Sequence, residues 1–306
     1  MPFVVKVVNR GMSPDNGRLG AAWWALWTNL GLALAKLVGG WLFGSRALLA
    51  DGLHSLGDTA GSVAVLYGLH FGSAPPDEDH PYGHERAEAL ASFAVGLLLL
   101  LGGASLGGDA VRRLWRPSAV GPAWPALIIA AGALLVKDVI YRGSKSRAET
   151  SGSAAYWANA ADSRVDIWSS AVAMGGILAA RLGFPWADAA GAVVVSLLVI
   201  GAGFQLARGN LRELLESHDP RVDTAVRAVA QQVDGVQTIS ELRTRMMGPF
   251  LLVDVRIGVN GDLTVRAGHE IAHRVATAVH RDVPRVREVL VHVDPVHVRG
   301  GGDGGG

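Results

Sequence analysis

The chain has 306 residues, of which 50% are hydrophobic and only 18% are charged, whereas soluble domains usually carry roughly 25% charged residues. Its formal net charge is +1, so the charge balance gives no indication of a nucleic-acid partner. The absence of cysteine excludes disulfide bonds and thiolate metal ligands.

Composition changes along the chain and predicts four segments. Residues 1–19 lack the apolar core of a cleavable signal peptide, so we expect a short N-terminal tail. Long apolar runs fill residues 20–207, which predicts a transmembrane domain. Residues 208–298 are rich in Arg, Asp, Glu and His, which predicts a soluble domain, and the glycine-rich residues 299–306 predict a disordered tail.

Six segments of the transmembrane domain are expected to cross the bilayer, because each offers about 20 mainly apolar residues. They are residues 21–43, 47–71, 87–110, 122–142, 154–181 and 187–207. An even number of spans places both termini on one side, and a modest excess of Lys and Arg on that side favours the cytoplasm.

The second and fifth spans are interrupted by ionisable residues at helical spacing. His54 and Asp58 lie four residues apart, and Asp162 and Asp166 repeat that spacing. Residues four apart share one face of a helix, and charged groups inside a bilayer are costly enough to indicate a function. One imidazole and three carboxylates on two facing helices predict a site for a divalent cation. Protons would compete for the same groups, which is the chemical basis of metal/proton exchange.

Other interpretations of these residues stay open at this point. The carboxylates could instead pair with Lys36 or Arg164 and bind no metal at all. Asp51 precedes His54 by three residues, and it is either an accessory acid of the site or a helix-end residue near the interface.

The segment after the second span contains a second candidate cluster. Asp77, His80 and His84 have i, i+3, i+7 spacing, and the two histidines flank a turn-forming Pro-Tyr-Gly. These three residues predict a peripheral metal site. The alternative is a solvated polar loop whose Glu85 and Glu88 stabilise the N-terminus of the next helix.

The soluble domain predicts the element order αββαβ, which is that of a small open-faced α+β sandwich. Residues 238–247 and 250–259 resemble a hairpin with Gly248-Pro249 at its turn. The helices are expected at residues 220–233 and 264–283, and the last strand at 286–298.

At residues 18–298 the chain resembles a cation diffusion facilitator. The segments that carry the resemblance are ALLADGLHSLGD at 47–58, HPYGHERAE at 80–88 and SRVDIWSS at 163–170. The resemblance implies a homodimeric secondary transporter, not an enzyme, that exports a divalent transition metal from the cytoplasm in exchange for protons. It also implies six transmembrane helices and a ferredoxin-like C-terminal domain in the cytosol.

The resemblance assigns roles to individual residues. The transport site would be His54, Asp58, Asp162 and Asp166, and a cytoplasm-facing loop site would be Asp77, His80 and His84. In the C-terminal domain a regulatory metal site would contain His269, His292 and Asp294, with Asp254 as a supplementary ligand.

Two departures from the family pattern affect these roles. Ser240 and Arg256 occupy positions that are histidine in some members, so a full binuclear cluster in the C-terminal domain is not expected. The alternative there is a set of solvated polar residues that bind no metal.

Asp162 stands where zinc-type members often have histidine, so the transport site has more oxygen ligands and becomes a harder site in the sense of metal-ligand chemistry. Zinc is the first expectation, and manganese, iron, cobalt, nickel and cadmium are the alternatives.

The expected partners are a second copy of the chain and the lipid bilayer, with no nucleic acid and no obligatory protein partner. The Ala-, Gly- and Arg-rich composition favours a prokaryotic inner or plasma membrane, with both termini in the cytoplasm. Two other classes fit the residues less well. A metal-dependent membrane hydrolase lacks an HExxH motif or a Ser/His/Asp set, and a non-transporting metal sensor or scaffold has no reason to keep four intramembrane ligands.

Overall fold

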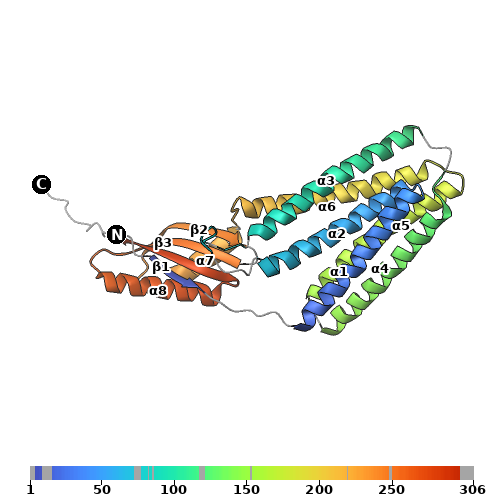
Figure 1. Ribbon diagram of the computed structural model, residues 1–306. Coiled ribbons are helices and arrows are strands. Elements are labelled where there is room, and N and C mark those ends of the chain that lie inside the picture. Colours follow the sequence, from blue (N-terminus) through green and yellow to red (C-terminus); the bar gives the residue numbers. More distant parts are fainter. Residues whose placement is uncertain are drawn as a thin grey trace. The chain divides into compact units, whose positions relative to one another are not determined.

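The computed structural model describes most of the chain, and its elements are shown in Figure 1. The described residues are 4–8, 16–71, 77–81, 83–84, 86–116, 121–151, 154–218, 220–247 and 250–296. The chain divides into two compact units. A helical unit comprises Pro14–Ala74 and Leu90–Leu211, and a mixed unit comprises Met1–Ser13, Pro75–Ala89 and Arg212–Gly306.

The described part of the chain contains six helices of 26 residues or more, in the order that the sequence predicts. They are α1 (Asn16–Leu42), α2 (Arg46–Phe71), α3 (Arg86–Trp115), α4 (Trp124–Ser151), α5 (Ala154–Arg181) and α6 (Ala187–Leu214). Each has at least 26 residues, which exceeds the roughly 20 needed to cross a bilayer. Within the described residues, α3, α4 and α6 are long and apolar enough to cross a membrane by length and composition alone.

Helices α3, α4 and α6 extend further at their C-terminal ends than the apolar runs indicate. The predicted spans stop at residues 110, 142 and 207, but the helices end at Trp115, Ser151 and Leu214. The additional turns are rich in Arg and other polar residues. The backbone hydrogen bonds of a helix do not need an apolar surrounding, so a helix can continue beyond its apolar run, and hydropathy marks the membrane-crossing part and not the helix end.

Glycine allows α1 and α2 to pack closely together. A Cβ atom on Gly40 would lie 2.7 Å from the backbone nitrogen of Leu49, and one on Gly52 would lie 2.9 Å from that of Leu37. Side chains larger than hydrogen would therefore separate the two helices. Such packing through small residues is how helices associate in lipid, where no hydrophobic force draws them together.

The start of α2 is fixed by a buried carboxylate from α6. Asp188 accepts hydrogen bonds from the Ser45 hydroxyl at 2.6 Å and from the Arg46 backbone N–H at 2.7 Å. Ser45 in turn accepts a hydrogen bond from the Leu48 backbone N–H at 3.1 Å. These contacts satisfy N–H groups that a helix N-terminus leaves unpaired and join the two helices at this point.

The mixed unit has the predicted αββαβ order. Its elements are α7 (Pro220–Gln231), β2 (Thr238–Met247), β3 (Phe250–Asn260), α8 (Val265–Asp282) and β4 (Val286–Val296). Strands β2 and β3 are antiparallel, and β3 and β4 are parallel, as a helical crossover between them requires. The predicted turn at Gly248-Pro249 lies outside the described residues.

A further strand, β1 (Val4–Val8), corrects the prediction that residues 1–19 form only a tail. It pairs antiparallel with β4, from Val4 opposite His292 to Val8 opposite Glu288, and the sheet order is β1-β4-β3-β2. Its sequence, VVKVV, is rich in β-branched residues. A strand this short is recognisable only with its partner, which lies at the other end of the chain.

Both helices of the mixed unit cover one face of the sheet (Figure 1). The core between them contains Val226 from α7, Val275 from α8 and Ile257 and Val289 from the sheet, all fully buried. Thr264 caps α8, because its hydroxyl accepts the Ala267 backbone N–H at 3.3 Å. Alternation along the strands sends the intervening polar side chains to the opposite face.

Candidate metal centres

Three of the four predicted transport ligands converge between α2 and α5. One donor atom from each of His54, Asp58 and Asp166 lies within 4.8 Å of the others. His54 Nε2 is 3.5 Å from Asp166 Oδ1, and both side chains are buried. In the described structure, His54 Nε2 and Asp58 Oδ2 are buried atoms without a hydrogen-bond partner. Imidazole nitrogen and carboxylate oxygen are ligands of divalent transition metals, so the arrangement suits a cation.

The fourth predicted ligand, Asp162, is placed differently. Its side chain is exposed and does not belong to the cluster. It precedes Asp166 by one helical turn, which is about 6 Å along the axis of α5. The spacing of the sequence puts both carboxylates near one face, but the packing of α5 against α2 brings only Asp166 to His54.

A buried lysine that the sequence analysis did not single out completes this cluster. Lys137 on α4 is nearly inaccessible, and its Nζ lies 2.6 Å from Asp166 Oδ2. The same ammonium donates to the side-chain oxygen of Asn29 on α1 at 3.1 Å. The sequence could have marked Lys137 as a candidate, because it lies within the predicted span 122–142 and an ionisable residue inside a span indicates function.

Asp51, expected either as an accessory acid or as a helix-end residue, belongs to a buried network of its own. Asp51 Oδ2 lies 2.8 Å from Lys36 Nζ, and the two side chains are each 1% exposed. The hydroxyls of Ser169 and Ser170 donate to the two Asp51 oxygens at 2.8 and 2.9 Å. Lys36 also donates to Ser55 and Ser170. The network joins α1, α2 and α5 beside the cluster of His54, Asp58 and Asp166.

A cavity of about 220 Å³ adjoins His54 and Asp58. Gly57 and Gly61 line it from α2, and apolar residues such as Leu99 and Val199 line it from α3 and α6. One water molecule takes about 30 Å³ in the liquid, so the space is sufficient for an ion with some of its water. His54 Nε2 and Asp58 Oδ2, which have no hydrogen-bond partner among the described residues, therefore lie next to a space with the volume of a cation and some of its water.

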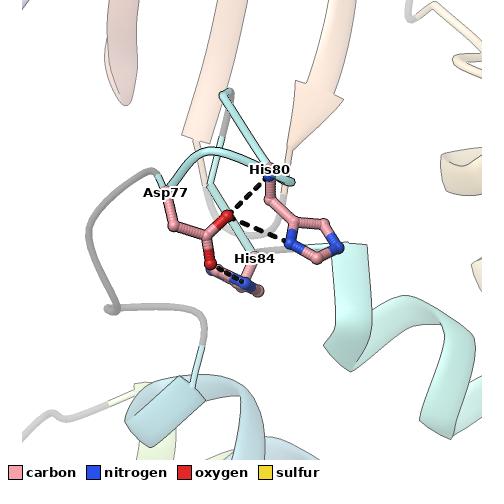
Figure 2. Close-up of side chains that lie close together, drawn as sticks. All are labelled: Asp77, His80 and His84. Carbon is pink, nitrogen blue, oxygen red and sulfur yellow. Dashed lines mark hydrogen bonds and ion pairs between the residues drawn. The ribbon is translucent and has the colours of Figure 1, made fainter.

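The loop residues Asp77, His80 and His84 also come together, as Figure 2 shows. Asp77 Oδ1 accepts the His80 backbone N–H at 2.6 Å and lies 3.2 Å from His80 Nδ1. Asp77 Oδ2 lies 3.2 Å from His84 Nε2. The hydrogen bond from the His80 backbone N–H lowers the pKa of Asp77 below its usual value. One carboxylate and two imidazoles form an exposed three-ligand set in the mixed unit.

The loop is connected to the C-terminal part of the same unit by an ion pair. Arg86, at the start of α3, pairs with Glu216, which follows α6 and has a φ of +55°. Arg245 on β2 lies 3.6 Å from the other Glu216 oxygen. The Arg86 hydrogen bond lowers the pKa of Glu216, so the carboxylate stays ionised at neutral pH.

The four residues expected to form a C-terminal site do not form one cluster within the described chain. His292 Nε2 is 2.9 Å from Asp294 Oδ1 on β4, and Arg256 lies 3.7 Å from the other Asp294 oxygen. His269 lies on α8, which packs against the opposite face of the sheet. Asp254 borders a different hollow, beside Arg243 and His218. Strand alternation separates His292 from α8, and this could not be recognised from residue types alone.

Comparison with known proteins identifies both units. Residues 22–215 match the family described as cation efflux transmembrane domain, and residues 219–296 match the cation efflux protein, cytoplasmic domain. The two matches together cover nearly all of the chain.

Three relatives illustrate the similarity. The manganese efflux system protein MneP of Bacillus subtilis (strain 168) is 34% identical over 279 residues, which are 89% of this chain and 94% of that protein. The magnetosome protein MamB of Paramagnetospirillum magneticum (strain ATCC 700264 / AMB-1) is 32% identical over 277 residues, which are 89% of this chain and 93% of that protein. A solved structure of MamM-CTD is 30% identical and covers 26% of this chain and 100% of its own, with a TM-score of 0.25. The chain therefore belongs to the cation diffusion facilitators, a family of membrane transporters of divalent metal cations.

Proposed function

We propose that this protein exports a divalent transition metal from the cytoplasm in exchange for protons. The observation that carries the proposal is the convergence of His54, Asp58 and Asp166 on α2 and α5. Asp162 would join them as a fourth ligand when a cation draws the carboxylates together. A buried cluster with a structural role alone would pair its polar atoms, whereas His54 Nε2 and Asp58 Oδ2 have no hydrogen-bond partner among the described residues.

Proton exchange follows from the chemistry of the ligands. A carboxylate or imidazole that binds a metal must first be deprotonated, so metal and protons compete for the same atoms. A site near the middle of a membrane domain, reached alternately from each side, would then couple metal exit to proton entry. The cavity beside His54 and Asp58 supports such access, because it offers room for a partly hydrated ion.

We place manganese first and zinc second as the transported ion. Zinc is the first expectation from the sequence, although Asp162 makes the site harder, and two observations support Mn²⁺. The ligand set is rich in carboxylate oxygen, which suits manganese, and the similar protein MneP is described as a manganese efflux system protein. Zinc generally binds such sites more tightly than manganese does. Selection of Mn²⁺ would therefore depend on a lower availability of free Zn²⁺ in the cell.

The proposed assembly is a homodimer in a prokaryotic inner membrane with both termini in the cytoplasm. Strand pairing supports a common side for the termini, because β1 at the N-terminal end lies beside β4 at the C-terminal end. The match of residues 219–296 to the cytoplasmic domain of cation efflux proteins supports a cytosolic location for that domain. The exposed loop cluster of Asp77, His80 and His84 would be a second, cytoplasm-facing metal site.

Metal uptake into proteoliposomes that contain the purified protein tests this function. The panel is Mn²⁺, Zn²⁺, Fe²⁺, Co²⁺, Ni²⁺ and Cd²⁺, with a pH-sensitive dye inside the vesicles. Flux of one or two ions with opposite proton movement, lost in Asp166→Ala, is the expected result. Metal binding without flux of any ion would instead support a sensor or scaffold.

A further inference from the structure

We infer that Lys137 is a positioning residue that restricts Asp166 to a single ligand oxygen and lowers the affinity of the site for its cation. The inference rests on the proposed function, since it concerns the same transport site. Lys137 Nζ is 2.6 Å from Asp166 Oδ2, whereas Asp166 Oδ1 faces His54 Nε2 at 3.5 Å. The two oxygens of one carboxylate thus have different partners, one on α4 and one on α2.

The lysine is held in place and is not an incidental surface contact. Its side chain is 4% exposed, and its second hydrogen bond, to Asn29 on α1, is 3.1 Å long. Lys137 therefore joins three helices, α1, α4 and α5, through one ammonium group. A buried ammonium needs an ionised or strongly polar partner, and Asp166 Oδ2 supplies it.

This geometry has two consequences for a bound cation. With one lone pair of Oδ2 engaged by the Lys137 ammonium, Asp166 presents Oδ1 to the cation, and bidentate coordination by this carboxylate is disfavoured. The ammonium also remains a few ångströms from the cation and repels it. Formal charges show the balance, because Asp58, Asp166 and the joining Asp162 supply three negative charges around the cation and Lys137 cancels one of them. A transporter needs a site that releases its ion, so weaker binding is consistent with turnover.

Lys137→Met tests the inference, with Lys137→Arg as the charge-conserving variant. The Met variant should lower the KM for Mn²⁺ uptake at least tenfold and lower the maximal rate by a similar factor, because the ion binds tightly and leaves slowly. The freed Asp166 Oδ2 should also let Ca²⁺, which takes six to eight oxygen ligands, compete with Mn²⁺. The Arg variant keeps the charge and should not show the tenfold fall in KM.

Lys36→Met is the matched control, because Lys36 is the other buried lysine of the described helices whose partner, Asp51, is outside the ligand cluster. It should reduce the amount of folded protein on size-exclusion chromatography without lowering KM. A fall in KM in this control, or an unchanged or higher KM in folded Lys137→Met, would overturn the inference. An equal KM for Mn²⁺ uptake in Lys137→Met and Lys137→Arg would also overturn the inference.

Direct metal binding separates this inference from the proposed function. Calorimetric titration of detergent-solubilised protein with Mn²⁺, with Asp166→Ala to identify the intramembrane site, requires no transport. If the wild type binds metal but transports none, the proposed function fails. Tighter binding by Lys137→Met would support the role of the lysine in that case, and unchanged or weaker binding would refute it.

Discussion

Lys36 on α1 and Asp51 on α2 form an ion pair in which Nζ and Oδ2 are 2.8 Å apart and each side chain is only 1% exposed. Ser169 and Ser170 of α5 donate to the same carboxylate, so both Asp51 oxygens are satisfied. The pair lies beside the ligand-bearing segments of α2 and α5. The pair therefore stabilises the packing of α1, α2 and α5 next to the candidate ligands.

Replacing only one member of this pair should destabilise the helical unit strongly. Asp51→Ala leaves the Lys36 ammonium buried without its counter-charge, which typically costs about 3–5 kcal/mol. The thermal unfolding midpoint of the purified protein in detergent measures the effect. The double variant Lys36→Met with Asp51→Asn should recover part of the loss, because no charge then remains buried. Equal stability of Asp51→Ala and wild type would contradict a structural role for the pair.

Asp162 and Asp166 should differ in their importance for transport. Asp166 contacts His54 and Lys137, so Asp166→Ala should reduce metal flux at least 100-fold. Asp162 is exposed and outside the cluster, so Asp162→Ala should mainly raise KM, by about tenfold, which corresponds to about 1.4 kcal/mol of binding free energy. Initial rates in proteoliposomes over a range of Mn²⁺ concentrations give both quantities. Equal losses in the two variants would show that both carboxylates are needed to the same degree.

The loop cluster should bind a metal ion independently of transport. Asp77→Ala removes the carboxylate that contacts both His80 and His84, so one equivalent of Co²⁺ binding should be lost while flux persists. The visible absorption of bound Co²⁺ reports this site. The matched control is Glu78→Ala, which removes a neighbouring acid that lies outside the cluster. Loss of Co²⁺ absorption in the control would argue against the assignment.

The pH dependence of this loop follows from the lowered pKa of Asp77. A group whose pKa is lowered by folding stabilises the folded loop above its unfolded pKa, near 4, and this contribution disappears as pH falls through the folded value. The hydrogen bond from the His80 backbone N–H should therefore persist at pH 4. The His80 amide resonance of isotope-labelled protein, followed by NMR between pH 7 and pH 2, measures it. A transition centred above pH 4 would contradict the lowered pKa.

The N-terminal strand should protect β4. Lys6→Pro removes a backbone N–H and fixes φ, so β1 should detach from its partner, where Lys6 lies opposite Leu290. Hydrogen–deuterium exchange of residues 288–292 should then accelerate, with no change in β2. Lys6→Thr, which keeps the N–H and the strand propensity, is the matched control. Unchanged exchange in Lys6→Pro would show that β1 contributes nothing to the edge of the sheet.

The elements and their order followed from local patterns. Long apolar runs predicted six helices, and alternating or helical periodicity predicted αββαβ. The spacing of His54 with Asp58, and of Asp162 with Asp166, placed each pair near one helix face, and three of these residues do meet. The length of the apolar runs did not predict the polar turns at the ends of α3, α4 and α6, because hydropathy marks only the part of a helix that lies within the bilayer.

The sequence by itself determined the membrane helices, the order of the C-terminal elements and the chemistry of the ligands, because each depends on neighbours within a few residues. Only the tertiary structure decided which charges meet. Lys137 pairs with Asp166 across 29 residues, Lys36 reaches Ser170 across 134, and β1 finds β4 at the opposite end of the chain. Such pairs depend on how helices and strands pack, and no local periodicity encodes the partner that a buried charge will face.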